Sequence, residues 1–229
     1  LPSTLERLEG LCFQGCSSLT SITIPSSVTY IDQPFLGCSS LTSIVVESGN
    51  LVYDSRNNCN AIIETASGKL ISGCSTTVIP QGVTSIEEYA FEGQAALTSI
   101  ILPNSVLRIR GRAFTFCSSL NAITIPSSVQ VIEETAFWGC SSLTSINIPD
   151  GVHIIGRRAF YGCHNLHNIR IPIDINIIEE YAFYCCMSHL FTDITIPDGI
   201  ISIGRKAFYG CDFLENIYML SKVPPIALR

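Results

Sequence analysis

The stretch CSSLTSITIPSSV spans residues 16–28, and near-copies of it recur along the chain. CSSLTSIVV begins at Cys38, CSSLNAITIPSSV at Cys117 and CSSLTSINIPDGV at Cys140. Repetition at a fixed interval is typical of architectures in which each unit buries its apolar face against its neighbours. The interval is 23 residues over the middle of the chain, where prolines stand at positions 80, 103, 126, 149 and 172.

Written out, the unit is LxxIxIPxxVxxIxxxAFxGC, and a period of about 20 to 29 residues containing LxxLxL is the leucine-rich-repeat signature. The last apolar residues of LxxIxI alternate, which predicts a strand with one buried face, closed by the proline. VxxI adds a second apolar edge, and AFxGC predicts a tight turn or short helix with a buried phenylalanine. That phenylalanine marks eight units: Phe13, Phe35, Phe91, Phe114, Phe137, Phe160, Phe183 and Phe208.

These features predict a leucine-rich-repeat solenoid of the β-rich α/β class, with stacked parallel strands and short helical or 3-10 turns. We expect it to form a single domain over residues 1–229.

The unit over residues 47–80 is longer than the others. From Glu47, where a proline is expected, to Pro80 there are 33 residues instead of 23. Within it AII and KLI flank TASG, which predicts a β-hairpin projecting from the stack. If Ile63 faces Leu70, the same antiparallel register places Cys59 opposite Cys74. The two cysteines would then form a disulfide or remain reduced thiols.

The repeating unit resembles the BspA-like leucine-rich repeats over nearly the whole chain. The departures are local: Val46 and Glu47 lack the proline, Gln94 replaces Cys, and Phe116 and Cys185 replace Gly. YCCMSHLFTD also adds two residues before the next strand. The resemblance implies a surface or secreted protein of a host-associated microbe, located outside the cell or on its surface and involved in adhesion to host matrix or cells.

Composition narrows the range of partners. The chain is 47% apolar and 14% charged with a net charge of −6, so it offers no positive field to nucleic acid. It contains no apolar run of about 18 residues, and we expect no membrane insertion of this segment. LPSTLERL enters the repeat partway through a unit, and SKVPPIALR, with Pro224 and Pro225, lacks a polar cap. We therefore expect further sequence on both sides.

Most cysteines follow the repeat. Stacked copies point in the same direction rather than at each other, so we expect buried thiols without reactivity. In one of the eight units Gln94 takes the place of the cysteine. We expect Cys12 to be a further buried core residue. The repeated position is held by Cys16, Cys38, Cys117, Cys140, Cys163, Cys186 and Cys211.

Two neighbouring units also carry Cys163, His164, His167, Cys186 and His189, the residue types that bind zinc. Two of these cysteines belong to the buried row and the histidines fall in a variable loop, so we predict no metal site. We also predict no cofactor.

Charges before each AF alternate in sign from unit to unit. We therefore expect these charges to pair between neighbouring units, rather than to steer binding partners. Such pairing would oppose a slip by one unit, because the slip would bring like charges together. The residues are Glu87 and Glu88, Arg110 and Arg112, Glu133 and Glu134, Arg157 and Arg158, Glu179 and Glu180, and Arg205 and Lys206.

No catalytic motif is present, neither GxSxG, P-loop, GxGxxG after a strand nor HExxH, so an enzyme is not expected. A sheet of repeated strands instead presents a row of outward residues suited to an extended protein partner. That row comprises Thr23, Val45, Ile101, Thr124, Asn147, Arg170, Thr195 and Tyr218.

The row becomes larger and more polar towards its C-terminal end, and Arg and Tyr are enriched where binding energy concentrates. We therefore predict a protein-binding or adhesion module. Two alternatives remain open: these side chains are merely solvated, or the chain is a spacer without a ligand of its own. The candidate binding residues are Asn147, His167, Asn168, Arg170, Thr195 and Tyr218.

Overall fold

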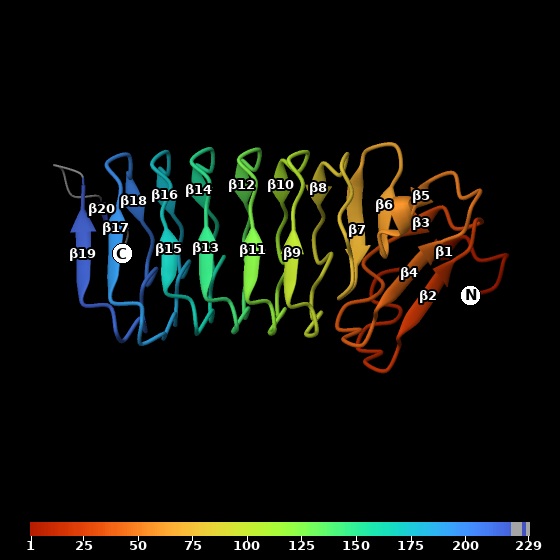
Figure 1. Cartoon of the computed structure of the whole chain (residues 1–229), viewed down its shortest axis with the longest axis horizontal. Helices are drawn as coiled ribbons and strands as arrows, with labels where there is room; N and C mark the ends of the chain where they lie inside the picture. The colour runs from red at the N-terminus through yellow and green to blue at the C-terminus, as the bar shows by residue number, and fades with distance from the viewer. Residues whose placement is uncertain (221–225, 228–229) are drawn as a thin grey trace.

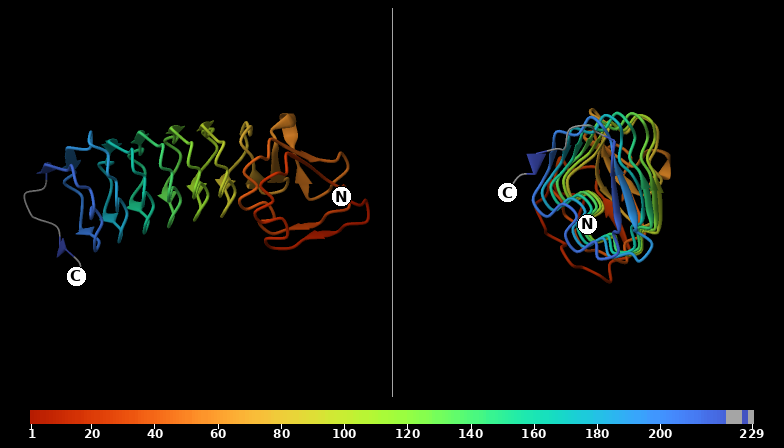
Figure 2. Two further views of the ribbon diagram at one scale, coloured as in Figure 1. Left: turned by 90° about the horizontal axis from the view of Figure 1, so that it is seen from below. Right: turned by 90° about the vertical axis from the view of Figure 1, so that its left-hand side faces the viewer.

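The computed structural model describes residues 1–220 and 226–227, so Pro224 and Pro225 lie outside this part of the chain. The chain forms an elongated β-solenoid whose coils superpose when viewed along the long axis (Figure 1, Figure 2). This confirms the predicted leucine-rich-repeat solenoid of stacked parallel strands.

The LxxIxI segments form the first face of the solenoid, which we call the LxxIxI face. Its strands pair in parallel as three separate sheets, because the ladder is interrupted twice. They are β2 (Ser21–Ile24) and β4 (Ser43–Val46); β9 (Ser99–Ile101), β11 (Ala122–Thr124), β13 (Ser145–Asn147) and β15 (Asn168–Arg170); and β17 (Asp193–Ile196) and β19 (Asn216–Met219).

The VxxI segments form a second parallel ladder, where the sequence predicted only an apolar edge. β1 (Arg7–Leu8) pairs with β3 (Tyr30–Ile31). The others pair in parallel within one ten-stranded sheet: β8 (Ser85–Ile86), β10 (Arg108–Ile109), β12 (Val131–Ile132), β14 (Ile154–Ile155), β16 (Ile177–Ile178), β18 (Ser202–Ile203) and β20 (Ile226–Ala227). The same sheet is completed by three strands of the hairpin unit: β5 (Tyr53–Asp54), β6 (Ala61–Glu64) and β7 (Lys69–Gly73). β6 pairs antiparallel with both β5 and β7, and β7 pairs in parallel with β8.

The AFxGC segments are tight turns, the first of the two predicted alternatives. In the described part of the chain the only helix is η1 (Arg56–Asn58), a short 3-10 helix outside these turns. Stacked turns are joined by backbone hydrogen bonds, such as the 2.8 Å bond from the Phe137 amide to the Ala159 carbonyl. Each regular unit therefore bonds to the next along three lines: two strand ladders and one turn ladder.

Phenylalanine rings fill the interior beside the turns. From Phe91 to Phe208, successive rings stack with centroids 5.1–5.3 Å apart and planes within 8° of parallel. Phe91 and Phe183, like the three rings between them, are fully buried. The predicted phenylalanine core is confirmed there, whereas Phe13 and Phe208, near the two ends, are only half-buried.

The row of cysteines is buried from Cys38 onward, and its thiols do more than fill space. Cys117 Sγ donates to the Phe91 carbonyl at 3.1 Å, and Cys140 Sγ donates to the Phe114 carbonyl at 3.1 Å. Each thiol thus bonds the preceding unit. Burial raises the pKa of the Cys117 and Cys140 thiols, which keeps them protonated and able to donate.

Two expectations about the cysteines were wrong at the N-terminal end. Cys12 and Cys16 are exposed rather than buried, because the first unit has no described neighbour covering its outer side. The predicted thiol row therefore begins at Cys38.

The hairpin of β6 and β7 lies inside the ten-stranded sheet, between β5 and β8, so the expectation that it projects from the stack was wrong. Ile62, Ile63 and Leu70 are fully buried, and this apolar content explains why the hairpin stays in the sheet.

Ile63 does face Leu70, but a bulge then shifts the register so that Ile62 faces Ser72. The shift separates the two cysteines of the hairpin unit. Cys59 lies in the larger core and Cys74 in the smaller N-terminal core, and both are free thiols. The sequence left open a disulfide or two reduced thiols, and the structure has two reduced thiols.

The charged positions pair between neighbouring units in part. Arg157 lies 3.2 Å from Glu180 and 3.8 Å from Glu134, and Arg110 lies 3.8 Å from Glu133. All these side chains are at least partly exposed, so each pair contributes little to stability. Arg112 and Arg158 instead lie over tyrosine rings, at 5.4 Å from Tyr89 and 5.3 Å from Tyr181.

Candidate binding surface

The predicted outward residues form a continuous row wherever strands pair. Thr23 is opposite Val45, Thr124 opposite Asn147, Asn147 opposite Arg170, and Thr195 opposite Tyr218. All eight members of the row are exposed. Their neighbours along the middle strands, such as Ile123, Ile146 and Ile194, are buried, as the period-2 pattern requires. On β19, at the C-terminal end of the face, Ile217 and Met219 are exposed as well.

The row has one further member that the sequence pattern did not reveal. Val78, two residues before Pro80, occupies the same position in the hairpin unit and is 73% exposed. Its signal in the sequence is VIP at residues 78–80, where the end of the strand pattern and its proline return after the insertion.

The LxxIxI face is interrupted between β15 and β17, where the two additional residues of YCCMSHLFTD lengthen the connection. No ladder joins these two strands, although both pair normally on their other sides. A cleft of about 370 Å³ lies at this break. Arg170, Asp193, Thr195 and Tyr218 all line it, so it brings together three of the six candidate binding residues.

Arg170 is held in place on one wall of this cleft. Its Nη2 lies 2.9 Å from Asp150 Oδ1, and the same carboxylate oxygen accepts the Ile173 amide at 3.1 Å. The guanidinium of Arg170, followed by the Ile173 amide, lowers the pKa of Asp150. The arginine is thus oriented, while its side chain remains about half exposed.

The opposite wall carries a second oriented carboxylate. Asp193 accepts hydrogen bonds from Thr192 Oγ1 at 2.7 Å and from Asn216 Nδ2 at 2.8 Å, and both lower its pKa. The cleft therefore presents a cationic and an anionic group on facing strands, with the exposed Tyr218 ring beside them.

The other three candidates do not line the cleft. Asn147 and Asn168 are exposed on β13 and β15, and His167 just precedes β15 with its Nδ1 2.8 Å from the Asn165 carbonyl. They remain part of the same face: His167 and Asn168 lie at the start of β15, the strand that borders the break, and Asn147 lies one strand further away.

The zinc alternative gains no support from the geometry. Cys163 and Cys186 are buried, with their thiols directed at the carbonyls of Phe137 and Phe160. His164 and His189 are exposed. Over residues 1–220 and 226–227, no group of three or more His, Cys, Asp or Glu side chains converges on one point.

An aromatic row on the turn edge was not predicted. In the last four units the residue after the repeat phenylalanine is aromatic, namely Trp138, Tyr161, Tyr184 and Tyr209, and the recurring FWG, FYG and FYC triplets are its signal. The three tyrosine rings stack with centroids 4.6–5.1 Å apart. Because their faces cover one another, the row strengthens the turn ladder rather than offering flat platforms to a ligand.

Comparison with known proteins identifies the family. The model of the BspA type leucine rich repeat region matches residues 1–67, 70–189 and 130–227, with six copies. The chain therefore belongs to the BspA type leucine-rich-repeat family. No curated protein sequence matches it significantly.

Solved bacterial structures share the fold. A leucine rich cell surface protein from Faecalibacterium prausnitzii is 31% identical with a TM-score of 0.71, over 97% of this chain and 53% of that one. The leucine-rich-repeat protein of T. pallidum is 25% identical with a TM-score of 0.63, over 76% and 82%. The pneumococcal vaccine antigen PcpA, at 20% identity and a TM-score of 0.62 over 90% and 56%, shares the fold alone.

This chain thus spans about half the length of the F. prausnitzii structure. Among its described residues, no helix has the length and apolar character needed to cross a bilayer.

Proposed function

We propose that this chain is a non-catalytic protein-binding module that recognises an extended protein partner through the C-terminal half of its LxxIxI face. The observation that carries the proposal is the cleft between β15 and β17. There a break in an otherwise regular ladder gathers Arg170, Thr195 and Tyr218 on an exposed surface. Tyr and Arg are the side chains most often found at the energetic centres of interfaces.

The groups in the cleft suit a polar segment of a protein partner. Arg170, oriented by its salt bridge to Asp150, offers its remaining guanidinium N–H groups to an acceptor, and Asp193 offers an oriented acceptor to a cationic or amide group. Their fixed positions reduce the entropy lost on binding, since the salt bridge to Asp150 and the bond from Asn216 already restrain them. His167 and Asn168 extend the polar surface along β15, and Asn147 extends it by one strand, to β13.

The proposed setting is the surface of a bacterial cell or the surrounding medium, with a host matrix or cell-surface protein as the partner. It is supported by the BspA type family match and by the F. prausnitzii relative, which is described as a cell surface protein. Catalysis is not proposed, because the sequence contains none of the motifs that would supply a nucleophile, a phosphate loop or a metal base.

The test is binding of the purified chain to immobilised fibronectin, laminin and collagen, measured by surface plasmon resonance. For any protein that binds, Arg170→Glu and Tyr218→Ala should each reduce affinity at least about tenfold, the loss expected for one interface anchor. Thr124→Glu, in the same row but two strands from the cleft, serves as the matched control and should have little effect.

Each contrary result has a defined meaning. Unchanged affinity of both cleft variants would move the site to another face of the solenoid. If the wild-type chain binds no matrix protein, the alternative of a spacer that holds a neighbouring domain away from a surface is favoured.

A further inference from the structure

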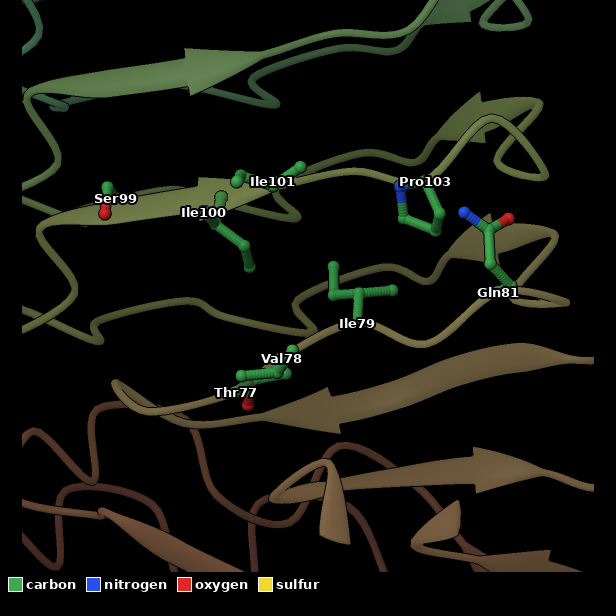
Figure 3. Close-up of a pocket in the computed structure, with 8 residues that line it drawn as sticks. All are labelled: Thr77, Val78, Ile79, Gln81, Ser99, Ile100, Ile101 and Pro103. Carbon is green, nitrogen blue, oxygen red and sulfur yellow. The ribbon is translucent and has the colours of Figure 1, made fainter. Parts of the chain in front are cut away.

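The LxxIxI face has a second interruption, at the other end of the four-stranded sheet. There the segment 77–79 of the hairpin unit runs beside β9 in the same direction, as Figure 3 shows. Val78 donates its amide to the Cys59 carbonyl, on the side away from β9. Within the described residues no backbone hydrogen bond joins segment 77–79 to β9, so the edge of β9 opposite β11 is unpaired.

A groove of about 380 Å³ lies along this unpaired edge. Ile79 and Ile100 form its floor and point towards each other, as seen in Figure 3. Both are almost fully buried, whereas Val78 and Ile101 on the flanks are 73% and 76% exposed. None of the eight side chains that line the groove is charged.

Two exposed β-branched side chains beside an unpaired strand edge are unusual, because proteins normally protect such edges with charges, prolines or covering segments. Val78 and Ile101 are also the two most exposed apolar members of the outward row. The corresponding position one strand further is Thr124, where the edge is paired. The apolar surface is thus concentrated where the ladder is open.

We propose that this groove binds an extended, uncharged polypeptide segment with alternating apolar residues, which adds to β9 as a strand. An unpaired strand edge offers amides and carbonyls at a regular spacing, and only another polypeptide backbone supplies matching partners at the same spacing. The apolar flanks select β-branched or other apolar side chains at alternate positions of that segment. The absence of charge distinguishes this partner from the polar one proposed for the cleft at β15 and β17.

The probe is a fluorescein-labelled peptide of alternating valine and threonine with two C-terminal lysines for solubility. Its binding to the whole chain is followed by fluorescence anisotropy. The control peptide has the same sequence with alternate backbone amides N-methylated, which removes the donors needed for strand pairing but keeps the side chains and the charge.

The expected result is saturable binding of the unmodified peptide and at least a tenfold weaker affinity for the N-methylated one. Ile101→Lys should weaken binding at least tenfold, because it places a charge on the apolar flank. Thr124→Lys, at the same position of the next strand, should not change it. Both positions are exposed, so circular dichroism should show both variants folded.

Three outcomes would overturn the proposal. Equal binding of both peptides would show an apolar contact without strand addition, and no saturable binding would show that the edge accepts no strand. The third is self-association of the wild-type chain in sedimentation velocity that Ile101→Lys abolishes, which would assign the groove to a second copy of this chain.

Discussion

The regular stack from β8 to β18 and the N-terminal units that carry β1 to β4 are built from nearly the same repeat, yet their cores differ. The regular units share one continuous core, whereas the N-terminal units form a separate, smaller cluster. In Figure 1, β2 and β4 also run obliquely to the strands from β9 to β19. The same local sequence thus contributes to a large continuous core or to a small separate one, depending on what lies beside it.

The hairpin unit is the cause of this difference, because it supplies strands but no phenylalanine turn. The Phe35 turn stacks directly on the Phe91 turn, through the Gly37 amide and the Glu92 carbonyl at 3.1 Å. At the level of the stacked phenylalanine rings, the backbone of Gly73 in β7 packs against the Phe91 ring. The Gly73 amide donates a hydrogen bond to the Ala90 carbonyl at 2.8 Å. A strand therefore replaces one ring of the stack, and the two cores separate at that point.

The sharpest test of this comparison removes one ring from each region. Phe137→Ala leaves a cavity between two rings that each lie 5.3 Å away, and it should lower the free energy of unfolding by about 3–5 kcal/mol. Phe13→Ala removes a half-buried ring and should cost no more than about 2 kcal/mol. Urea denaturation followed by circular dichroism measures both. Equal losses would contradict the idea of unequal cores.

A smaller effect is expected at the boundary between the two cores. A Cβ added at Gly73 would lie 2.2 Å from Phe91 Cε1, so Gly73→Ala must displace the first ring of the stack. Overpacking of this kind costs about 1–3 kcal/mol. Gly151→Ala is the matched control, because its added Cβ would meet no atom closer than 3.5 Å. Thermal denaturation compares the two, and a harmless Gly73→Ala would mean that the ring does not rest on β7.

The cysteine row provides a third contrast. Cys140→Ala removes a buried thiol that bonds the Phe114 carbonyl, and we expect a loss of about 1–2 kcal/mol from the missing bond and the small cavity. Cys16→Ala, at the same position of the first unit, changes an exposed side chain and should stay within about 0.5 kcal/mol. The difference in urea midpoint between these variants reports how far the buried row extends.

The smallest effect concerns backbone strain within the regular turns. The last residue of the FxG triplet in each phenylalanine turn has a left-handed backbone conformation, with positive φ. It is glycine in most units, but in one unit it is Cys185, with φ 56°. Cys185→Gly should raise stability by about 1 kcal/mol because it relieves this conformation. Gly162→Ala, at the same position with φ 69°, should lower stability by a similar amount, since its added Cβ would meet only His164 Nε2, at an ordinary contact distance of 3.7 Å. Differential scanning calorimetry resolves shifts of this size.

Much of the fold was predictable because each regular unit repeats the same contacts. The spacing of Phe114 and Phe137 predicted that both rings are buried at the same position of neighbouring units, and the alternation around Thr124 predicted which residues face outward. The hairpin was found, and Ile63 was paired correctly with Leu70. The bulge next to that pair was not predicted, since the inserted Ile71 carries no signal that distinguishes a bulge from regular pairing, and the position of Cys74 was therefore wrong.

The candidate site was predictable only in part. Arg170 and Tyr218 were recognised as exposed members of one face, but the salt bridge to Asp150 and the cleft beside Thr195 were not foreseen. These depend on where neighbouring coils separate, which follows from the packing of a lengthened loop rather than from any residue type. The groove beside Val78 could not be predicted either, because it depends on how the hairpin unit packs beside β9.

The sequence by itself determined the period of the repeat, which residues of each coil face inward or outward, and that equivalent residues of successive coils lie above one another. These features depend only on contacts between a unit and its nearest copy. Only the tertiary structure decided where the ladder breaks, which thiols are buried and which exposed side chains share a cleft. Those outcomes depend on which segment lies beside each coil, and the hairpin unit and the lengthened loop before β17 change that neighbour in ways that the repeat pattern does not specify.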